Sequence, residues 1–196
     1  EDAAEALGSY LGSKHLGTHS LFGCLSFNGN KIITTGGGGA IITNNYNYFK
    51  IAKHLATTAK IPHKYKYIHD KVGFNYRMPS LNASIGIAQL LKLKKFISAK
   101  RKLFTEYEKS FSKIDGVKVY KEVKNNKSNY WLQTLVLDDN YTGLKEKIIK
   151  FCISKKIFVR PSWTLLSELK PYKNFPKMNL SGAKNIEKKI INLPSS

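Results

Sequence analysis

The chain has 196 residues, and its 42% hydrophobic content is enough to build a core, so intrinsic disorder is excluded and one large domain or two small ones are expected. The formal net charge of +20 invites a nucleic-acid-binding interpretation. Only three of the 33 basic residues are arginines, however, and the lysines are scattered, which is typical of a solvated basic surface.

The cysteines and the apolar runs bear on the cellular compartment. Cys24 and Cys152 lie in apolar surroundings without metal-ligand spacing, so both are expected to be small buried residues in a reducing compartment. No apolar run reaches the roughly 18 residues of a membrane span, and we expect a cytoplasmic location. The chain opens on EDAAEALG without a methionine, which suggests a fragment whose beginning lies elsewhere.

The first 79 residues are predicted to form an α/β layer. Two strand-like runs cover residues 21–27 and 40–43, and an amphipathic helix is expected over residues 45–59. A polar, aromatic loop, IPHKYKYIHDKVGFNYRMP, follows at residues 61–79.

A long helix is predicted next, over residues 80–112, starting near Pro79 or Ser80. Its apolar residues recur mostly at spacings of three, four and seven, which places them on one stripe of a helix. These residues are Leu81, Ile85, Ala88, Leu93, Ile97, Phe104, Tyr107 and Phe111.

Residues 113–196 are predicted to form a second, small α/β domain. Strands are expected at residues 117–120, 130–137 and 157–160, and a helix at residues 142–155. The cluster KNNKSN at residues 124–129 is predicted to be a loop, because asparagine tolerates left-handed backbone conformations.

Lys31 is the candidate for covalent chemistry. It is the only lysine, arginine, aspartate or glutamate between Leu16 and Phe49. Apolar surroundings disfavour an ammonium ion and favour the neutral amine that attacks a carbonyl, as in a Schiff-base lysine. The alternative is a surface turn, since FNGN is a turn sequence. The glycines at positions 36–39 allow positive φ or close approach to a ligand, although such runs also serve as flexible connections.

Asp2 adds a carboxylate 29 residues before this lysine. It either caps a helix beginning at AAEALG or partners a cofactor. Pyridoxal phosphate needs one lysine for its aldehyde and one carboxylate for its pyridine nitrogen, so the two residues together suggest that cofactor.

Five ordered segments carry a resemblance to a known family: EDAAEALGS, GCLSFNGNKIITTGGGGAIITNN, HDKVGFNYRMPSLNASIGIAQL, VRPSW and INLPSS. They resemble the DegT/StrS family of pyridoxal-phosphate-dependent nucleotide-sugar aminotransferases, in its bacillosamine, legionaminic acid or perosamine-type branch. The resemblance implies transferase fold type I, like aspartate aminotransferase. Residues 1–79 would be the remainder of the large cofactor-binding domain, residues 80–112 a connecting helix, and residues 113–196 the small C-terminal domain.

The resemblance also implies residue roles around the cofactor. Lys31 would form the imine and carry the proton between the cofactor's C4′ and the substrate carbon, and Asp2 would hold the pyridinium. Glu5 matches the position near the 3-hydroxyl, and Ser26 matches the serine that binds the phosphate. Asn75 matches the asparagine that reaches the phosphate of the partner subunit, so a homodimer with shared sites is expected.

Four further residues are candidates for substrate contacts. Arg77 would either hold backbone carbonyls at the dimer contact or face the nucleotide sugar. His69, Arg160 and Trp163 are weaker candidates for contacts with the nucleotide sugar.

The implied reaction is transamination of a 4-keto-6-deoxy nucleotide sugar, with glutamate as the amino donor, for surface glycan biosynthesis. The family's N-terminal half is not present in the 196 residues, and we expect this piece alone to bind the cofactor weakly and to turn over nothing.

Two alternatives are a basic nucleic-acid-binding module and a sugar dehydratase of the same family, in which histidine replaces the lysine. Lys31 argues against the dehydratase. A catalytically inactive relative is disfavoured by the retained residues Asp2, Ser26, Lys31 and Asn75.

Overall fold

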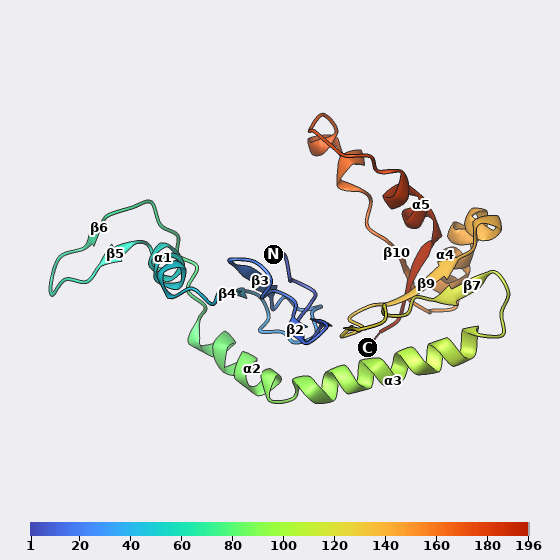
Figure 1. The fold of residues 1–196 in the computed structure, drawn as a ribbon, viewed down its shortest axis with the longest axis horizontal. Coiled ribbons are helices and arrows are strands. Elements are labelled where there is room, and N and C mark those ends of the chain that lie inside the picture. The colour runs from blue at the N-terminus through green and yellow to red at the C-terminus, as the bar shows by residue number, and fades with distance from the viewer. Residues whose placement is uncertain (196) are drawn as a thin grey trace. The chain divides into compact units, whose positions relative to one another are not determined.

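The computed structural model describes residues 1–195, and the chain divides into two compact units (Figure 1). The first unit consists of Glu1–Ser98 and Glu122–Trp131, and the second of Ala99–Lys121 and the chain from Leu132 onward. Both contain helices and strands, as the predicted α/β class requires.

The first unit is built around an antiparallel hairpin. Strands β3 (Gly23–Ser26) and β4 (Gly39–Ile42) pair with Leu25 opposite Ala40, close to the two predicted runs. Asp2 forms a parallel bridge to Cys24, which places the N-terminal segment beside β3. A Cβ on Gly39 would lie 2.3 Å from the Leu25 carbonyl oxygen, so the hairpin can close here only around a glycine.

A second, three-stranded sheet joins distant parts of the sequence. Strands β1 (Tyr10–Leu11), β2 (Lys14–His15) and β8 (Asn126–Lys127) pair in the order β2-β1-β8. The segment predicted as a loop at residues 124–129 thus contributes a short strand, although Asn125 does adopt the left-handed conformation, with φ of 68°.

Helix α1 (Tyr46–Ala56) lies within the predicted range, and Asn45 caps it by accepting hydrogen bonds from the Asn47 and Tyr48 N–H groups. The polar loop that follows contains an unpredicted hairpin of β5 (Lys60–Ile61) and β6 (Ile68–His69).

The predicted long helix is two helices, so this prediction was wrong in its continuity. Helix α2 (Ser80–Leu90) starts where expected, and α3 (Leu93–Phe111) follows after a break. At the break the Lys92 N–H bonds to the Gln89 carbonyl, a three-residue spacing that tightens the chain. The sequence carries the cause, because the apolar stripe steps by five residues from Ala88 to Leu93 and loses its helical phase.

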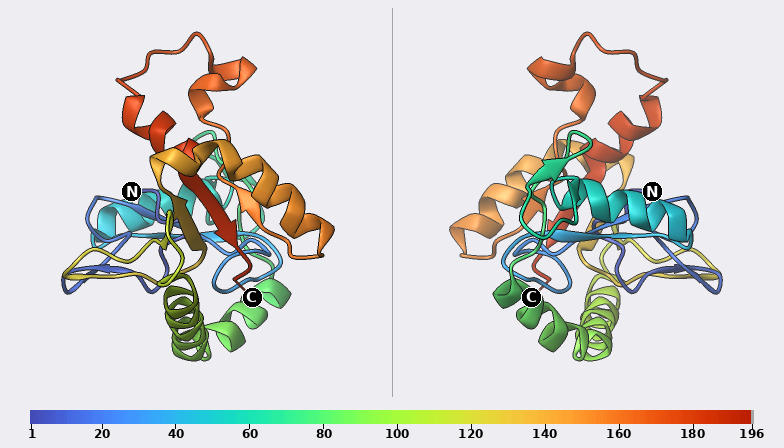
Figure 2. Two further views of the ribbon diagram at one scale, coloured as in Figure 1. Left: turned by 90° about the vertical axis from the view of Figure 1, so that its right-hand side faces the viewer. Right: turned by 90° about the vertical axis from the view of Figure 1, so that its left-hand side faces the viewer.

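The second unit is organised by a four-stranded antiparallel sheet in the order β10-β11-β9-β7. Its strands are β7 (Val117–Val119), β9 (Gln133–Leu137), β10 (Arg160–Pro161) and β11 (Ile190–Leu193). Figure 2 shows β11 beside β9, and this interior strand, which was not predicted, carries the fully buried Ile191. Leu137 of β9 is buried as well, so β9 and β11 supply the core of the unit.

Helices and turns surround this sheet. The helix predicted at residues 142–155 is α4 (Lys145–Ser154), and its first turn belongs instead to the 3-10 helix η1 (Asp139–Leu144). Two short 3-10 helices follow, η2 (Leu166–Glu168) and η3 (Lys170–Tyr172), and then α5 (Ser181–Lys189). The strand predicted at residues 157–160 is shifted and begins only at Arg160.

Helix α3 holds the residues that follow β11. The Tyr107 hydroxyl donates to the Pro194 carbonyl over 2.9 Å, and the Lys100 ammonium donates to the Ser195 carbonyl. Burial lowers the pKa of Lys100 and raises the pKa of Tyr107, because desolvation disfavours the charged form of each group.

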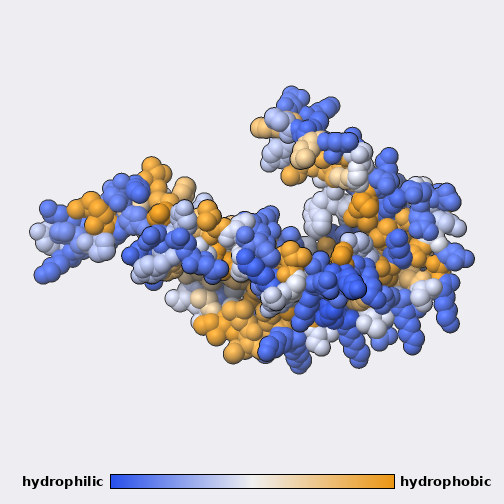
Figure 3. Space-filling model, in the orientation of Figure 1, coloured by the Kyte–Doolittle hydropathy of each residue, from blue (hydrophilic) through white to orange (hydrophobic). Residues whose placement is uncertain are grey.

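The exposure of the two cysteines differs from the prediction, and an apolar surface is present on α2. Cys24 is exposed and Cys152 half-buried, so the expectation that both cysteines are buried was wrong; alternation along β3 turns Cys24 outward. Figure 3 shows apolar side chains gathered over α2, where Leu81 and, just after the end of the helix, Leu91 are largely exposed. None of the helices formed by residues 1–195 combines the length and the apolar character that crossing a bilayer needs.

Candidate functional site

Lys31 sits in the loop that connects β3 with β4. Its N–H donates to the Asn28 carbonyl over 3.0 Å, which closes a tight turn, and the Thr35 N–H donates to the Phe27 carbonyl over 3.0 Å. Ile33 is almost fully buried and anchors the loop to the first unit. The predicted turn is therefore present, and it holds the lysine backbone in a defined place.

The glycine run closes the same loop. Gly36 and Gly38 have φ of 81° and 90°, which confirms the expected positive φ at this run. The Phe27 N–H donates to the Gly38 carbonyl, so these glycines return the chain to β4.

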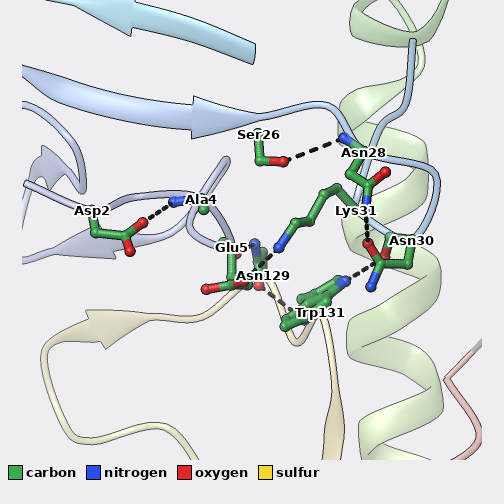
Figure 4. A network of polar contacts seen from close by, with 9 residues as sticks. All are labelled: Asp2, Ala4, Glu5, Ser26, Asn28, Asn30, Lys31, Asn129 and Trp131. Carbon is green, nitrogen blue, oxygen red and sulfur yellow. Dashed lines mark hydrogen bonds and ion pairs between the residues drawn. The ribbon is translucent and has the colours of Figure 1, made fainter. Parts of the chain in front are cut away.

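The Lys31 amine pairs with a carboxylate that is distant in sequence. Its Nζ contacts the Glu5 Oε1 (Figure 4), although the neighbourhood of Lys31 along the chain contains no acid. The Lys31 side chain is 12% exposed and that of Glu5 is 50% exposed. The ammonium is thus held in a shielded place while its partner faces water.

Asp2 and Ser26 lie on the two segments joined by the bridge of Asp2 to Cys24. The Asp2 Oδ1 accepts the Ala4 N–H over 3.1 Å, but residues 3–9 form turns, so the predicted helix start was wrong. Gly8, with φ of 84°, and its N–H bond to the His15 imidazole hold the chain in this irregular path. The Ser26 Oγ accepts the Asn28 N–H over 3.3 Å, which links it to the lysine turn.

Two residues of this network were missed by the sequence analysis. The Trp131 Nε1–H donates to the Asn30 carbonyl over 2.6 Å, and the Lys31 Nζ lies 4.5 Å from the centroid of the Trp131 ring. Asn129 is buried, and its side-chain amide donates to the carbonyls of Glu5 and Leu7. The paired polar and aromatic residues in SNYW were the local signal, but nothing in that segment indicates contact with residues more than 100 positions away.

The remaining candidates of the first unit lie in two other places. Asn75 and Arg77 line a hollow of about 690 Å³ between the β3–β4 hairpin and α1, which Cys24 and Phe49 also line. The His69 Nδ1 is hydrogen-bonded to the Thr58 carbonyl over 2.7 Å, beside the β5–β6 hairpin.

Arg160 and Trp163 belong to the second unit, and both side chains are exposed. Their roles in binding a nucleotide sugar, like those of Asn75, Arg77 and His69, stay predictions.

The fold is shared with a solved structure. PseC of Helicobacter pylori, an aminotransferase involved in the biosynthesis of pseudoaminic acid, superposes with a TM-score of 0.92 at 22% sequence identity, over 98% of this chain and 53% of that chain. The architecture is that of fold type I, as predicted.

The whole chain, residues 1–196, matches the DegT/DnrJ/EryC1/StrS aminotransferase family, and the protein belongs to this family. EpsN of Bacillus subtilis (strain 168), assigned to the pyridoxal phosphate-dependent aminotransferases, is 40% identical over 163 residues, which are 83% of this chain and 41% of EpsN. GDP-perosamine synthase of Escherichia coli O157:H7 is 34% identical over 196 residues, which are 100% of this chain and 52% of that enzyme. The chain spans about half the length of these curated relatives.

The chemistry of the donor set fits pyridoxal phosphate, the cofactor of this family. One unit provides a shielded amine at Lys31, an exposed carboxylate at Asp2 and a hydroxyl at Ser26. These are the groups that an aldehyde, a pyridine nitrogen and a phosphate require. The Glu5 carboxylate balances the charge of the Lys31 ammonium.

Proposed function

We propose that this chain supplies the lysine-bearing part of an enzyme that transaminates a 4-keto-6-deoxy nucleotide sugar, with glutamate as amino donor. The observation that carries the proposal is the shielded Lys31 amine on a closed turn, paired with a single carboxylate, in a chain of this family. The name of the E. coli relative, GDP-perosamine synthase, supports a nucleotide sugar as substrate.

Pyridoxal phosphate, when bound, supplies an aldehyde that takes up amino groups and a ring that accepts electrons. Lys31 would bind the aldehyde carbon through Nζ and, once released, move a proton between that carbon and C4 of the sugar. A positioned general acid or base of this kind contributes about 10² to 10⁴ in rate. Glu5, adjacent to Nζ, would hold the ammonium form between these steps.

Asp2 would hold the proton on the pyridine nitrogen. A carboxylate at about 4 Å and an effective dielectric of about 20 favours the protonated ring by about 4 kcal/mol. Ser26 would donate to the phosphate, and its link to the Asn28 N–H ties that contact to the lysine turn. The sugar dehydratase alternative lacks an imine-forming lysine, and Lys31 disfavours it.

We also propose a homodimer in which Asn75 reaches the phosphate of the partner subunit, with Arg77 at the contact or at the nucleotide sugar. The exposed apolar residues of α2 support assembly, because a large apolar surface on a soluble protein usually marks an interface. His69, Arg160 and Trp163 are proposed to contact the nucleotide sugar.

The test is to map the cofactor adduct. The 196-residue chain is mixed with excess pyridoxal phosphate and reduced with borohydride, and the pyridoxyl group is located by mass spectrometry. We expect the adduct to be enriched on Lys31 over the other lysines, although binding by this chain is expected to be weak. Labelling that follows exposure alone, without enrichment on Lys31, would contradict the site. Turnover of glutamate and a keto sugar by this chain would contradict the expectation that it is inactive by itself.

A further inference from the structure

Trp131 contacts the lysine turn at two points. Its indole N–H donates to the carbonyl of Asn30, the residue that precedes Lys31, and the Lys31 Nζ lies 4.5 Å from the ring centroid. The ring therefore contacts both the backbone that carries the lysine and the amine at the end of its side chain. Figure 4 shows the indole beside Lys31, next to Glu5.

The ring is itself held in place by a buried amide. The Trp131 N–H donates to the Asn129 Oδ1 over 2.9 Å, and the Asn129 N–H donates to the Ser9 Oγ over 3.0 Å. The Asn129 side-chain amide donates to the Glu5 carbonyl over 2.7 Å. The segment Asn129–Trp131 thus bonds to the backbone beside both members of the Lys31–Glu5 pair. Trp131 binds the carbonyl that precedes Lys31, and Asn129 binds the carbonyl of Glu5.

We propose that Trp131 is a positioning residue for Lys31. It holds the amine between the Glu5 carboxylate and the face of the indole, so that Nζ leaves Glu5 in one direction only. Cation–π attraction stabilises the ammonium against the ring, and the hydrogen bond to Asn30 prevents the turn from rotating away from it. The part of this inference that concerns the cofactor rests on the proposed function, whereas the part that concerns the free lysine does not.

Two labelling measurements on the 196-residue chain test the proposal. Limited acetylation with acetic anhydride reports how freely Lys31 is reached, and borohydride trapping with excess pyridoxal phosphate reports how well the amine meets an aldehyde. In Trp131→Leu we expect acetylation of Lys31 to rise by about threefold or more, and its pyridoxyl adduct to fall by about threefold or more. A residue that merely shields the lysine would raise both, so opposite changes identify positioning.

Trp131→Phe separates the ring from its hydrogen bond. It keeps a face for the ammonium but cannot donate to Asn30, so we expect changes in the same two directions and of smaller size, about twofold. This conservative variant also decides the matter if Trp131→Leu fails to fold, which a general rise in acetylation, including at the shielded Lys145, would reveal.

The chain contains a matched control for the ring contact. The Lys50 Nζ also lies 4.5 Å from a ring, that of Tyr46, on the exposed surface of α1. Acetylation of Lys50 in Tyr46→Leu is expected to change by less than about twofold, because water already solvates that ammonium.

The outcomes separate the two proposals. If Lys31 acetylation in folded Trp131→Leu and Trp131→Phe stays at the wild-type rate, or if both labels rise together, the positioning role is wrong. If acetylation rises but wild type shows no enriched adduct at Lys31, the contact to the free lysine stands, and the proposed function and the cofactor part of this inference fail. If wild type shows the adduct and neither variant lowers it, the inference fails while the proposed function survives.

Discussion

Each unit of the molecule contains a shielded lysine paired with a glutamate, and the two pairs differ in what else surrounds them. In the first unit Lys31 is 12% exposed and contacts the Glu5 carboxylate. In the second unit the Lys145 side chain is 10% exposed and lies 3.1 Å from the Glu187 carboxylate. Burial and pairing therefore do not distinguish them.

Their remaining contacts do. The Lys145 ammonium also donates to the Glu187 backbone carbonyl, and so ties the start of α4 to α5. Lys31 has a ring face in place of a carbonyl and sits on a turn between strands. The Lys145 ammonium is held by two acceptors of one residue, which suits a structural tie, whereas the Lys31 ammonium has one carboxylate acceptor and a ring face among the described contacts and can exchange more readily. Shielding identifies a reactive lysine only when the amine can leave its partner.

The largest expected effect is on cofactor trapping. Lys31→Ala should lower the pyridoxyl adduct above the background shared by the exposed lysines by about tenfold or more, because the amine proposed to bind the aldehyde is removed. Lys145→Ala should leave the adduct within about twofold of wild type. Mass spectrometry after borohydride reduction measures both, and equal losses in the two variants would abolish the distinction between the pairs.

The free energy of unfolding should depend more on Lys145 than on Lys31. Lys145→Met removes the ammonium that pairs with the Glu187 carboxylate and, among the described residues, leaves the Glu187 carbonyl only the Ser162 hydroxyl, 3.5 Å away, as a side-chain donor, and we expect the free energy of unfolding to fall by about 1 to 3 kcal/mol. Lys31→Met leaves Glu5, which is half exposed and can be solvated, so its cost is expected to be at most about 1 kcal/mol. Urea unfolding followed by circular dichroism compares the two, and a larger loss for Lys31→Met would contradict the structural role of Lys145.

Releasing the amine from its carboxylate should have a smaller effect. Glu5→Gln keeps the shape of the side chain but removes the charge that holds the ammonium, and the acetylation rate of Lys31 should rise by about two- to fivefold. Glu187→Gln should change acetylation of Lys145 less, because the backbone carbonyl still accepts its donor. Peptide-level mass spectrometry resolves both lysines, and a larger rise at Lys145 would reverse the comparison.

Patterns within a few residues allowed much of this to be predicted. The β3–β4 hairpin, α1, β7 and β9 follow from alternation, amphipathic spacing and turn residues. Lys31 was singled out by the absence of neighbouring charge along the chain, a local property, whereas its Glu5 partner comes from a different segment.

Contacts between distant segments account for what was missed. Trp131 and Asn129 act on residues 101 and 124 positions away, so no window of the sequence contains both partners. Strand β11 follows a lysine-rich helix and is only four residues long, and its identity depends on pairing with β9. The break between α2 and α3 coincides with a five-residue step in the apolar stripe. A single helix was predicted because the spacing on each side of that step fits a helix.

The smallest expected effect concerns an exposed pair, His54 and Asp70, which serves as a reference for the two shielded lysine–glutamate pairs. The His54 Nε2 lies 2.6 Å from the Asp70 Oδ1, and this hydrogen bond, followed by the histidine's charge, holds the pKa of Asp70 below its ordinary value of 3.8. A lowered carboxylate pKa stabilises the folded form above the unfolded-state value, and the contribution disappears as pH falls through the folded-state value. Asp70→Asn and His54→Ala should therefore both lower the thermal midpoint slightly at pH 5, and the difference from wild type should vanish as the pH is taken well below 3.8.

Because the two groups act as one pair, the thermal midpoint of the double variant should fall no further than that of either single variant. A difference that grows toward low pH would show that the bond stabilises the protonated carboxyl instead, and that this pair cannot serve as the exposed reference.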